Sequence, residues 1–309
     1  MTLLRRLPAT LALIAAAAVL ARAQTPAPLA ALVDRAAHAT LEIFHDEKLT
    51  ADELAITLVD LRDPKKSERA SFRGDVQIYP ASVIKLFYLA AVHRWLEDGR
   101  LADTPELRRA LKDMIVVSSN DATSYIVDVL TGTTSGPELP PDEIKIWFER
   151  RNAVNRYFAS LGYRNFNASK KPWGDGPFGR EKQATDLFEP KRNMLTTDIT
   201  ARLLTEIVTG QCVTTARSAE MMALLSRDPA SNDPDPDDQA KFTGPVLPPG
   251  SKLWSKAGWT STARHDAAYV ELPNGAKFVL VVFTMNHAND HEIIHEVAKA
   301  VVAGLMAAK

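Results

Sequence analysis

The sequence of 309 residues contains one cysteine, Cys212. A single cysteine cannot form an intramolecular disulfide, so the fold depends on its packed core, and the neighbours of Cys212 carry no signature of a cysteine nucleophile. The chain also lacks an excess of either charge, with a formal net charge of −1 at pH 7. Without a basic surface, we expect no nucleic acid as a partner.

Long apolar runs are absent except near the N-terminus, where residues 11–20 follow Arg5 and Arg6 and precede a small-residue segment at 21–23. This order is typical of a secretory signal peptide, which we predict over residues 1–23. The run is too short to span a membrane comfortably. We therefore expect a periplasmic or secreted monomer that keeps no membrane span after cleavage and acts on small molecules or wall polymers.

The remaining chain has the composition of a globular protein, since 46% of all residues are hydrophobic and 24% are charged. Apolar spacing predicts helices and strands in an order that places a long helical block between two groups of strands. The predicted helices are 29–46, 82–98, 105–117, 122–130, 141–161, 197–209 and 292–306, and the predicted strands are 54–61, 76–79, 252–255, 267–272 and 277–283.

This order predicts an α/β (α+β) fold, in which an antiparallel sheet is flanked by N- and C-terminal helices and an all-helical part is inserted between early and late strands. We divide the mature domain, 24–309, into an α/β part at 24–81 and 246–309 and a helical part at 82–245. The seam between the two parts is where we expect a cleft.

The pattern Ser82-Val83-Ile84-Lys85 begins a strongly apolar helical segment and places a hydroxyl and an amine one turn apart. An activated serine needs a nearby base, and a lysine at i+3 is within reach of it. Apolar surroundings disfavour the charged ammonium, which would make Lys85 such a base. The alternative is a serine that caps a core helix beside a lysine that extends to solvent.

Two further patterns follow in order, Ser118-Ser119-Asn120 and Lys256-Ala257-Gly258, and each is predicted at the end of an element. With Ser-x-x-Lys they make the chain resemble the penicillin-recognising serine enzymes, in particular the class A β-lactamases. Phrases such as Asn193-Met194-Leu195-Thr196-Thr197 extend the resemblance along most of the mature chain. Helix capping by Ser118 or Asn120 and a solvated charge at Lys256 are the simpler alternatives.

The resemblance implies that Ser82 attacks a lactam or amide carbonyl and becomes acylated. Lys85 is then the base, alone or with a water, and Ser118 relays a proton to the leaving nitrogen. Asn120 is expected to hydrogen-bond Lys85 and the side-chain amide of the substrate. No cofactor or metal is implied.

On the substrate side, the resemblance implies an oxyanion site formed by the backbone N–H groups of Ser82 and Trp259, which follows Gly258. Lys256 is expected to face the substrate carboxylate, helped by Arg264. The usual hydroxyl after this lysine is missing because position 257 is alanine, so Thr260 or Ser261 is a candidate replacement.

Class A enzymes also carry a glutamate that activates the deacylating water, but no Glu-x-x-Leu-Asn pattern precedes Thr196. Counting back from Thr196 indicates Glu181, with Asp175 and Glu189 as alternatives. β-Lactam hydrolysis is therefore the leading prediction. The alternatives are a D-alanyl-D-alanine carboxypeptidase or a penicillin-binding protein that forms a lasting acyl-enzyme.

A competing motif lies near the C-terminus, where His291-Glu292-Ile293-Ile294-His295 matches the zinc-binding pattern H-E-x-x-H and His287 precedes it. Too few residues follow to complete a metalloprotease cleft, and no Gly-x-x-His continues the motif. We expect a helix face packed on the sheet, and keep a zinc metalloprotease and a non-catalytic wall-binding protein as remote alternatives.

Overall fold

The computed structural model describes residues 28–173 and 175–307. Its centre is one antiparallel sheet in the order β2-β1-β6-β5-β4-β3, in which early and late strands pair directly through β1 and β6. The predicted α/β (α+β) fold is confirmed. The strands are β1 Leu54–Asp60, β2 Glu68–Phe72, β3 Ser226–Arg227, β4 Lys252–Trp259, β5 Ala263–Glu271 and β6 Lys277–Met285.

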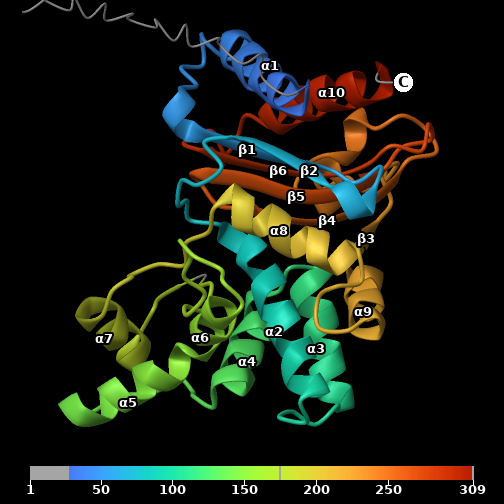
Figure 1. Cartoon of the computed structure of the whole chain (residues 1–309). Helices are drawn as coiled ribbons and strands as arrows, with labels where there is room; N and C mark the ends of the chain where they lie inside the picture. The colour runs from blue at the N-terminus through green and yellow to red at the C-terminus, as the bar shows by residue number, and fades with distance from the viewer. Residues whose placement is uncertain (1–27, 174, 308–309) are drawn as a thin grey trace, which may run out of the picture.

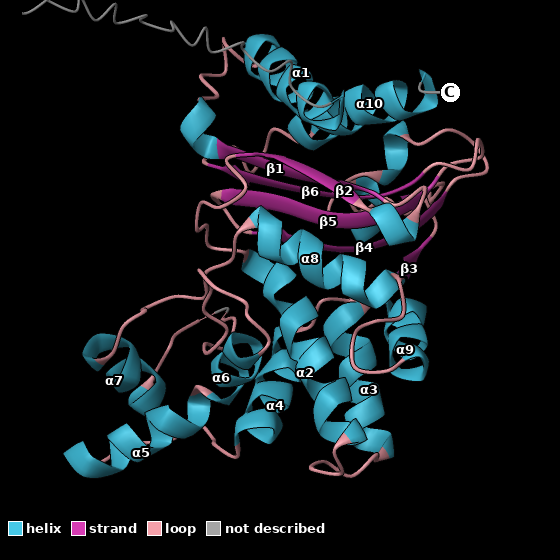
Figure 2. Cartoon of the chain, viewed as in Figure 1, coloured by secondary structure: helices cyan, strands magenta, loops and turns pink. Residues whose placement is uncertain are grey.

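Helices cover both faces of this sheet, as Figures 1 and 2 show. The N-terminal helix α1 and the C-terminal helix α10 pack together on one face, and the helical part from α2 to α9 lies on the other. The helices are α1 Pro28–Ile43, α2 Lys85–Glu97, α3 Pro105–Ile115, α4 Asn120–Thr131, α5 Pro141–Arg151, α6 Ala153–Ser160, α7 Gly179–Leu187, α8 Thr197–Val208, α9 Thr215–Leu225 and α10 Glu292–Ala307.

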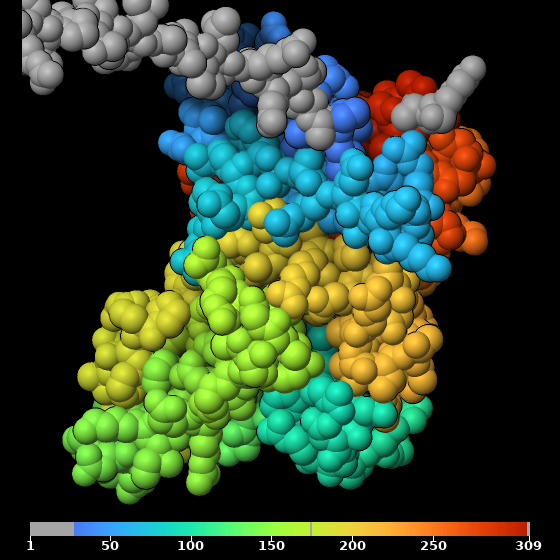
Figure 3. All heavy atoms as spheres, viewed as in Figure 1, coloured from blue at the N-terminus to red at the C-terminus, as the bar shows by residue number. Residues whose placement is uncertain are grey.

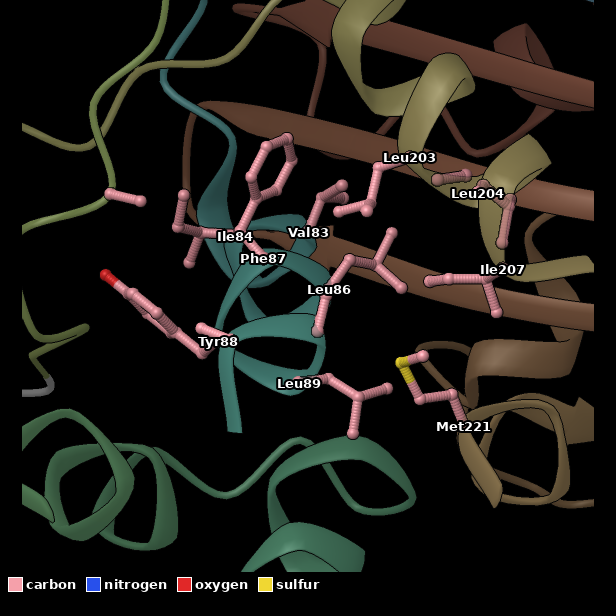
Figure 4. Close-up of a cluster of buried hydrophobic side chains, with 14 of the residues drawn as sticks. Val83, Ile84, Leu86, Phe87, Tyr88, Leu89, Leu203, Leu204, Ile207 and Met221 are labelled. Carbon is pink, nitrogen blue, oxygen red and sulfur yellow. The ribbon is translucent and has the colours of Figure 1, made fainter. Parts of the chain in front are cut away.

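Helix α2 is the centre of the helical part, because almost every one of its side chains from Lys85 to Val92 is buried. Leu86 and Leu89 face the apolar residues of α8 and α9, whereas the Tyr88 ring points to the opposite side (Figure 4). Helix α8 fills the space between α2 and the sheet. A helix surrounded in this way holds the residues at its N-terminus in fixed positions.

The prediction of a strand at 76–79 was wrong. Ile78 exchanges two backbone hydrogen bonds with Leu195, so this segment is tied to the loop before α8 and not to the sheet. The second strand is Glu68–Phe72, an edge strand whose residues are largely exposed. Edge strands often carry charged residues, so the sequence of Glu68–Phe72 resembles a loop, whereas the more apolar segment 76–79 resembles a strand.

The helix predicted over 141–161 is divided at Asn152, whose side chain donates to the carbonyl of Phe148 and whose backbone leaves the helical region. Helix α7 was not predicted because only Glu181 and Ala184 of its residues are buried, so it has no apolar periodicity. Strand β4 extends to Trp259, beyond the predicted end at residue 255.

The space-filling view separates the sheet layer, in blue and red, from the helical part, in green to orange (Figure 3). The predicted signal peptide at 1–23 lies outside the described residues. Within the described ranges, none of the helices has the length and apolar character that crossing a membrane requires.

Candidate active site

Ser82 lies in the 3₁₀ turn Ala81–Ile84, which leads directly into α2. Ala81 takes a positive φ of 46°, a conformation that non-glycine residues adopt rarely. Strand β4 packs against this turn so closely that a Cβ at Gly258 would lie 2.6 Å from the Ser82 nitrogen. Gly258 is therefore needed for the backbone of β4 to reach Ser82.

Lys85 is fully buried, and its ammonium group is held by the loop before α4. The Nζ lies 2.5 Å from the Ser118 carbonyl oxygen, 3.1 Å from the Ser118 Oγ and 2.9 Å from the Asn120 Oδ1. Burial lowers the pKa of Lys85 to about 7. A large share of Lys85 is thus neutral near pH 7 and able to accept a proton.

No hydrogen bond between the Ser82 Oγ and Lys85 is present in the described part of the chain. The two groups are one turn apart at the start of α2, and Ser82 is only half-buried, so its hydroxyl is accessible. In unliganded sites such catalytic contacts are often long and shorten when substrate binds.

Ser118 lies between the two motif lysines. Its Oγ is 3.1 Å from the Lys85 Nζ and 3.0 Å from the Lys256 Nζ. The backbone at Ser118 has a positive φ of 56°, and the neighbouring Ser119 caps α4 by accepting a hydrogen bond from the Ala122 N–H. The capping role therefore belongs to Ser119, which leaves the Ser118 hydroxyl free for the site.

Lys256 on β4 is also fully buried, and its Nζ donates to the Oγ of Ser118, the Oε1 of Gln239 and its neighbour's carbonyl at Ala257. Burial, and next the positive charge of Lys85, lower the pKa of Lys256 well below its usual range. The simpler interpretation of Lys256 as a solvated strand end is wrong, because the β4 edge is covered here by the segment around Gln239.

Gln239 is a site residue that the sequence did not reveal. Its amide nitrogen donates to the carbonyls of Ile115 and Val116 at the end of α3, while its Oε1 accepts from Lys256 at 2.7 Å. Gln239 therefore connects its own short segment with the end of α3 and with β4. Gln239 lies in the polar connector before β4 without any motif, so only tertiary contacts identify it.

The structure does not bring Arg264 to Lys256. Arg264 pairs with Trp259 across β4 and β5, whereas Lys256 pairs with Ala267, three residues away and so on the other face of the sheet. The buried guanidinium of Arg264 lies 2.7 Å from the Asp237 Oδ1 and stacks on Phe242. The Trp259 ring also packs on Phe242, so only the backbone of Trp259 is left for the site.

His265, a second residue missed by sequence reasoning, supports the turn that carries Ser82. It pairs with Gly258 across the strands, and its Nε2 lies 2.9 Å from the Tyr79 carbonyl oxygen while its Nδ1 accepts from the Thr284 N–H. Burial lowers the pKa of His265 to about 4, so the ring is neutral and its Nε2–H donates to Tyr79. The imidazole thereby fixes the backbone three residues before Ser82.

None of the three candidate carboxylates for deacylation hydrogen-bonds Ser82 or Lys85. Glu181 is buried and its Oε1 is shared by Arg151 at 2.5 Å, Ser135 at 2.9 Å and Lys171 at 3.5 Å. Glu181 is therefore part of a buried ion-pair cluster with Arg151 and Lys171.

The two alternatives, Glu189 and Asp175, are both exposed. Glu189 has a solvent-exposed side chain 3.6 Å from Lys191. It stands four residues before the buried Asn193, which is the spacing of glutamate and asparagine in Glu-x-x-Leu-Asn, with Arg192 in the place of the leucine.

The histidines of the H-E-x-x-H motif do not converge on a metal site. His295 on α10 places its Nε2 2.9 Å from the Lys241 carbonyl and its Nδ1 3.1 Å from Glu292, while His291 precedes the helix. No group of metal-binding side chains is found among the residues that the structure describes.

A comparison with protein-family models matches residues 102–305 to the beta-lactamase enzyme family. The matched range contains Ser118, Asn120 and Lys256, and begins after Ser82 and Lys85. No curated protein sequence matches the chain.

Solved structures resemble the whole fold at low sequence identity. A β-lactamase from Sphaerobacter thermophilus is 20% identical, with a TM-score of 0.64 over 88% of this chain and 97% of that one. The TLA-1 extended-spectrum β-lactamase is 16% identical, with a TM-score of 0.64 over 88% and 99%. PBP-A is 17% identical, with a TM-score of 0.61 over 88% and 96%. At these identities the likeness concerns the fold.

Proposed function

Because the chain belongs to the beta-lactamase enzyme family and is a hydrolase of the β-lactamase type, we propose that it hydrolyses β-lactams through an acyl-enzyme on Ser82. The observation that carries this proposal is the Ser118 hydroxyl, which lies within hydrogen-bond distance of both Lys85 and Lys256. Three motifs far apart in sequence thus meet at the N-terminus of one buried helix. A structural capping role for each serine does not require this meeting.

In the proposed reaction the Ser82 Oγ attacks the lactam carbonyl carbon while its proton passes to neutral Lys85, directly or through a water. The backbone N–H groups of Ser82 and Trp259 stabilise the oxyanion. The C–N bond then breaks, and the proton reaches the leaving nitrogen from Lys85 by way of the Ser118 hydroxyl. Water completes hydrolysis by releasing the acid from Ser82.

The carboxylate of the substrate is proposed to bind near Lys256, because an anion beside the amine favours its protonated, charged form. Asn120 is proposed to orient Lys85 and to contact the substrate amide. We assign no substrate contact to Arg264, since Asp237 already neutralises its guanidinium.

Release of product is the step that the geometry supports least, and this favours a second candidate function. Glu181 is engaged by Arg151 and Lys171, and Glu189 and Asp175 are exposed. Without a carboxylate at the ester, deacylation loses general-base help worth roughly 10²- to 10⁴-fold. The protein would then form a lasting penicillin adduct, as a penicillin-binding protein or a D-alanyl-D-alanine carboxypeptidase does.

Intact-mass measurement after mixing with benzylpenicillin tests both candidates. Rapid consumption of the drug without a lasting adduct supports β-lactam hydrolysis. A long-lived adduct that disappears in Ser82→Ala supports the second candidate. The absence of both turnover and adduct, with Ser82→Ala behaving as the wild type, contradicts acylation at Ser82.

We also propose that the protein is exported, on the strength of the signal-peptide pattern at residues 1–23. Expression of the full chain in a bacterium, followed by cell fractionation and N-terminal sequencing, tests this. Recovery of the uncleaved chain in the cytoplasm contradicts it.

A further inference from the structure

A cavity of about 290 Å³ lies beside the segment that precedes Ser82. Its wall is formed by Tyr79 and by the loop between α6 and α8, and none of its described lining residues is acidic. Four of them are cationic. The residues that matter here are Tyr79, Lys170, Trp173, Lys191, Arg192 and Asn193.

Lys170 and Lys171 are the two buried cations of the four, and only 8% of the Lys170 surface is exposed. Its Nζ has one hydrogen-bond contact, the Thr185 Oγ1 at 3.4 Å, and lies over the Phe148 ring. Burial lowers the pKa of Lys170 to about 8, so most of it remains protonated at pH 7. An ammonium group in such a place is stabilised by an anion, and the described residues supply none by direct contact.

The backbone around Lys170 is held rigidly. The Asn193 side chain accepts from the Lys170 N–H at 2.9 Å and donates to the Lys170 carbonyl at 2.7 Å, and the Tyr88 hydroxyl donates to the same carbonyl. Tyr88 belongs to α2, which begins at Lys85, three residues after Ser82. Its ring points away from the side chains of Leu86 and Leu89 (Figure 4). The backbone that carries this cation is therefore fixed relative to the proposed nucleophile before any ligand arrives.

Arg192 is the second cation without a counter-ion in the described structure. Its guanidinium stacks 4.1 Å above the Tyr79 ring. The other two cations are compensated, because Lys171 lies 2.7 Å from the Asp128 Oδ2 and Lys191 lies 3.6 Å from Glu189. Lys170 and Arg192 are thus the two cations of the wall that no carboxylate of the described residues contacts directly; the charges of Glu181 and Glu189 act on the buried Lys170 from a distance, and Arg192 is exposed.

The cavity lies close to the site of acylation. Tyr79 is three residues before Ser82, which limits the distance between their Cα atoms to about 11 Å. Lys256, proposed to face the lactam carboxylate, comes from β4 and does not line the cavity. When the lactam carboxylate of a substrate binds at Lys256, its acyl side chain is the part free to extend toward the cavity. There Tyr79 and Trp173 supply aromatic walls.

We propose that this cavity binds a carboxylate on the acyl side chain of the substrate, so that the enzyme prefers acyl donors with an acidic side chain. The proposal rests on the proposed acylation of Ser82. The substrate class comprises penicillins with a carboxylated arylacetyl group and peptides with a free carboxylate near the scissile amide.

Carbenicillin and benzylpenicillin provide the test, because they differ by one carboxylate on the side chain. The measurement is the second-order rate constant of the reaction with Ser82, followed by stopped-flow absorbance and intact mass. We expect wild type to prefer carbenicillin about tenfold, the size of one charge-assisted hydrogen bond. Lys170→Met and Arg192→Gln should each reduce this ratio about fivefold or more.

Lys182→Met is the matched control, since Lys182 is exposed on α7, pairs with Asp186 and does not line the cavity. It should leave the ratio unchanged. The ratio of the two rate constants also separates loss of side-chain recognition from damage to the fold. Damage to the fold should slow both penicillins equally, because both react with the same serine. A wild-type ratio near one, or a ratio that neither Lys170→Met nor Arg192→Gln alters, overturns the proposal.

Binding of phenylmalonate, the free side-chain acid of carbenicillin, gives a second readout that needs no acylation. Ligand-observed NMR at low ionic strength should detect binding to wild type that weakens in Lys170→Met and with added salt. If neither penicillin reacts while phenylmalonate still binds in this way, the function at Ser82 fails and the anion site stands. If phenylmalonate does not bind, the anion site fails whatever the penicillins do.

Discussion

Two clusters of buried lysine and arginine side chains differ in their counter-ions. In the first, Lys85 and Lys256 contact hydroxyl, amide and carbonyl oxygens around Ser118, and neither forms an ion pair within the described structure. Burial then lowers the pKa of both lysines. With a pKa of about 7, Lys85 can exchange protons near neutral pH, as the proposed acyl transfer requires.

In the second cluster, Arg151 and Lys171 are both paired with carboxylates, namely Asp128 and the buried Glu181. Charges that neutralise each other hold the loop between α6 and α8 against α4 and α5. Buried cations in this protein thus differ in their surroundings, because Arg151 and Lys171 are ion-paired whereas Lys85 and Lys256 lie among neutral oxygen atoms.

The largest effect is expected from Lys85→Met, which keeps the volume of the side chain but removes the base. We expect acylation by benzylpenicillin to slow by about 10³-fold, within the range of general-base catalysis. The folded state should survive, because an apolar side chain suits this buried site. Stopped-flow kinetics with a thermal melt checks both points, and a variant that acylates at the wild-type rate contradicts the role of Lys85.

Glu181→Gln should act on stability and not on acylation. Removing the charge leaves Arg151 and Lys171 with Asp128 alone, and breaking a buried pair costs about 3 kcal/mol. Urea unfolding checks the loss, with the exposed Glu143→Gln as the control that should change little. Unchanged stability together with slower deacylation would instead identify Glu181 as the deacylating base.

Gly258→Ala tests whether the first cluster depends on the contact between β4 and the Ser82 turn. The added Cβ would lie 2.6 Å from the Ser82 nitrogen, so the turn must shift. We expect acylation to slow by about 10²-fold, the typical result of a displacement of about 1 Å in a reactive site. Gly275→Ala, at a hairpin turn with open space around it, is a control for backbone strain without a clash, because its φ of 89° strains any residue with a Cβ.

The smallest effect is the pH dependence. With a pKa of about 7 for Lys85, acylation should rise about tenfold from pH 6 to pH 8 as the neutral amine becomes populated. Since the pKa is lowered in the folded state, the unfolded chain binds the extra proton between about pH 7 and 10.5. The free energy of unfolding from this group therefore increases with pH in that window, and Lys85→Met should flatten both curves.

The sequence predicted the fold class and the motif residues for a physical reason, because both depend on local patterns. Apolar periodicity identified the long helices and the late strands, and Ser-x-x-Lys, Ser-x-Asn and Lys-x-Gly marked residues that the fold then placed together. The strand at 76–79 was wrong because an apolar segment can be buried without joining a sheet. Helix α7 was missed because it buries only Ala184 and the ion-paired Glu181, and so has no apolar periodicity.

The sequence by itself determined which residues are candidates for the proposed acyl chemistry, since those residue types and spacings are readable along the chain. Only the tertiary structure decided which charges are neutralised. Asp237 forms an ion pair with Arg264, and Glu181 forms ion pairs with Arg151 and Lys171. In the described structure no carboxylate contacts the ammonium groups of Lys85, Lys256 and Lys170. The physical reason is that burial and counter-ions are set by segments far apart in sequence, and no local spacing records where they meet.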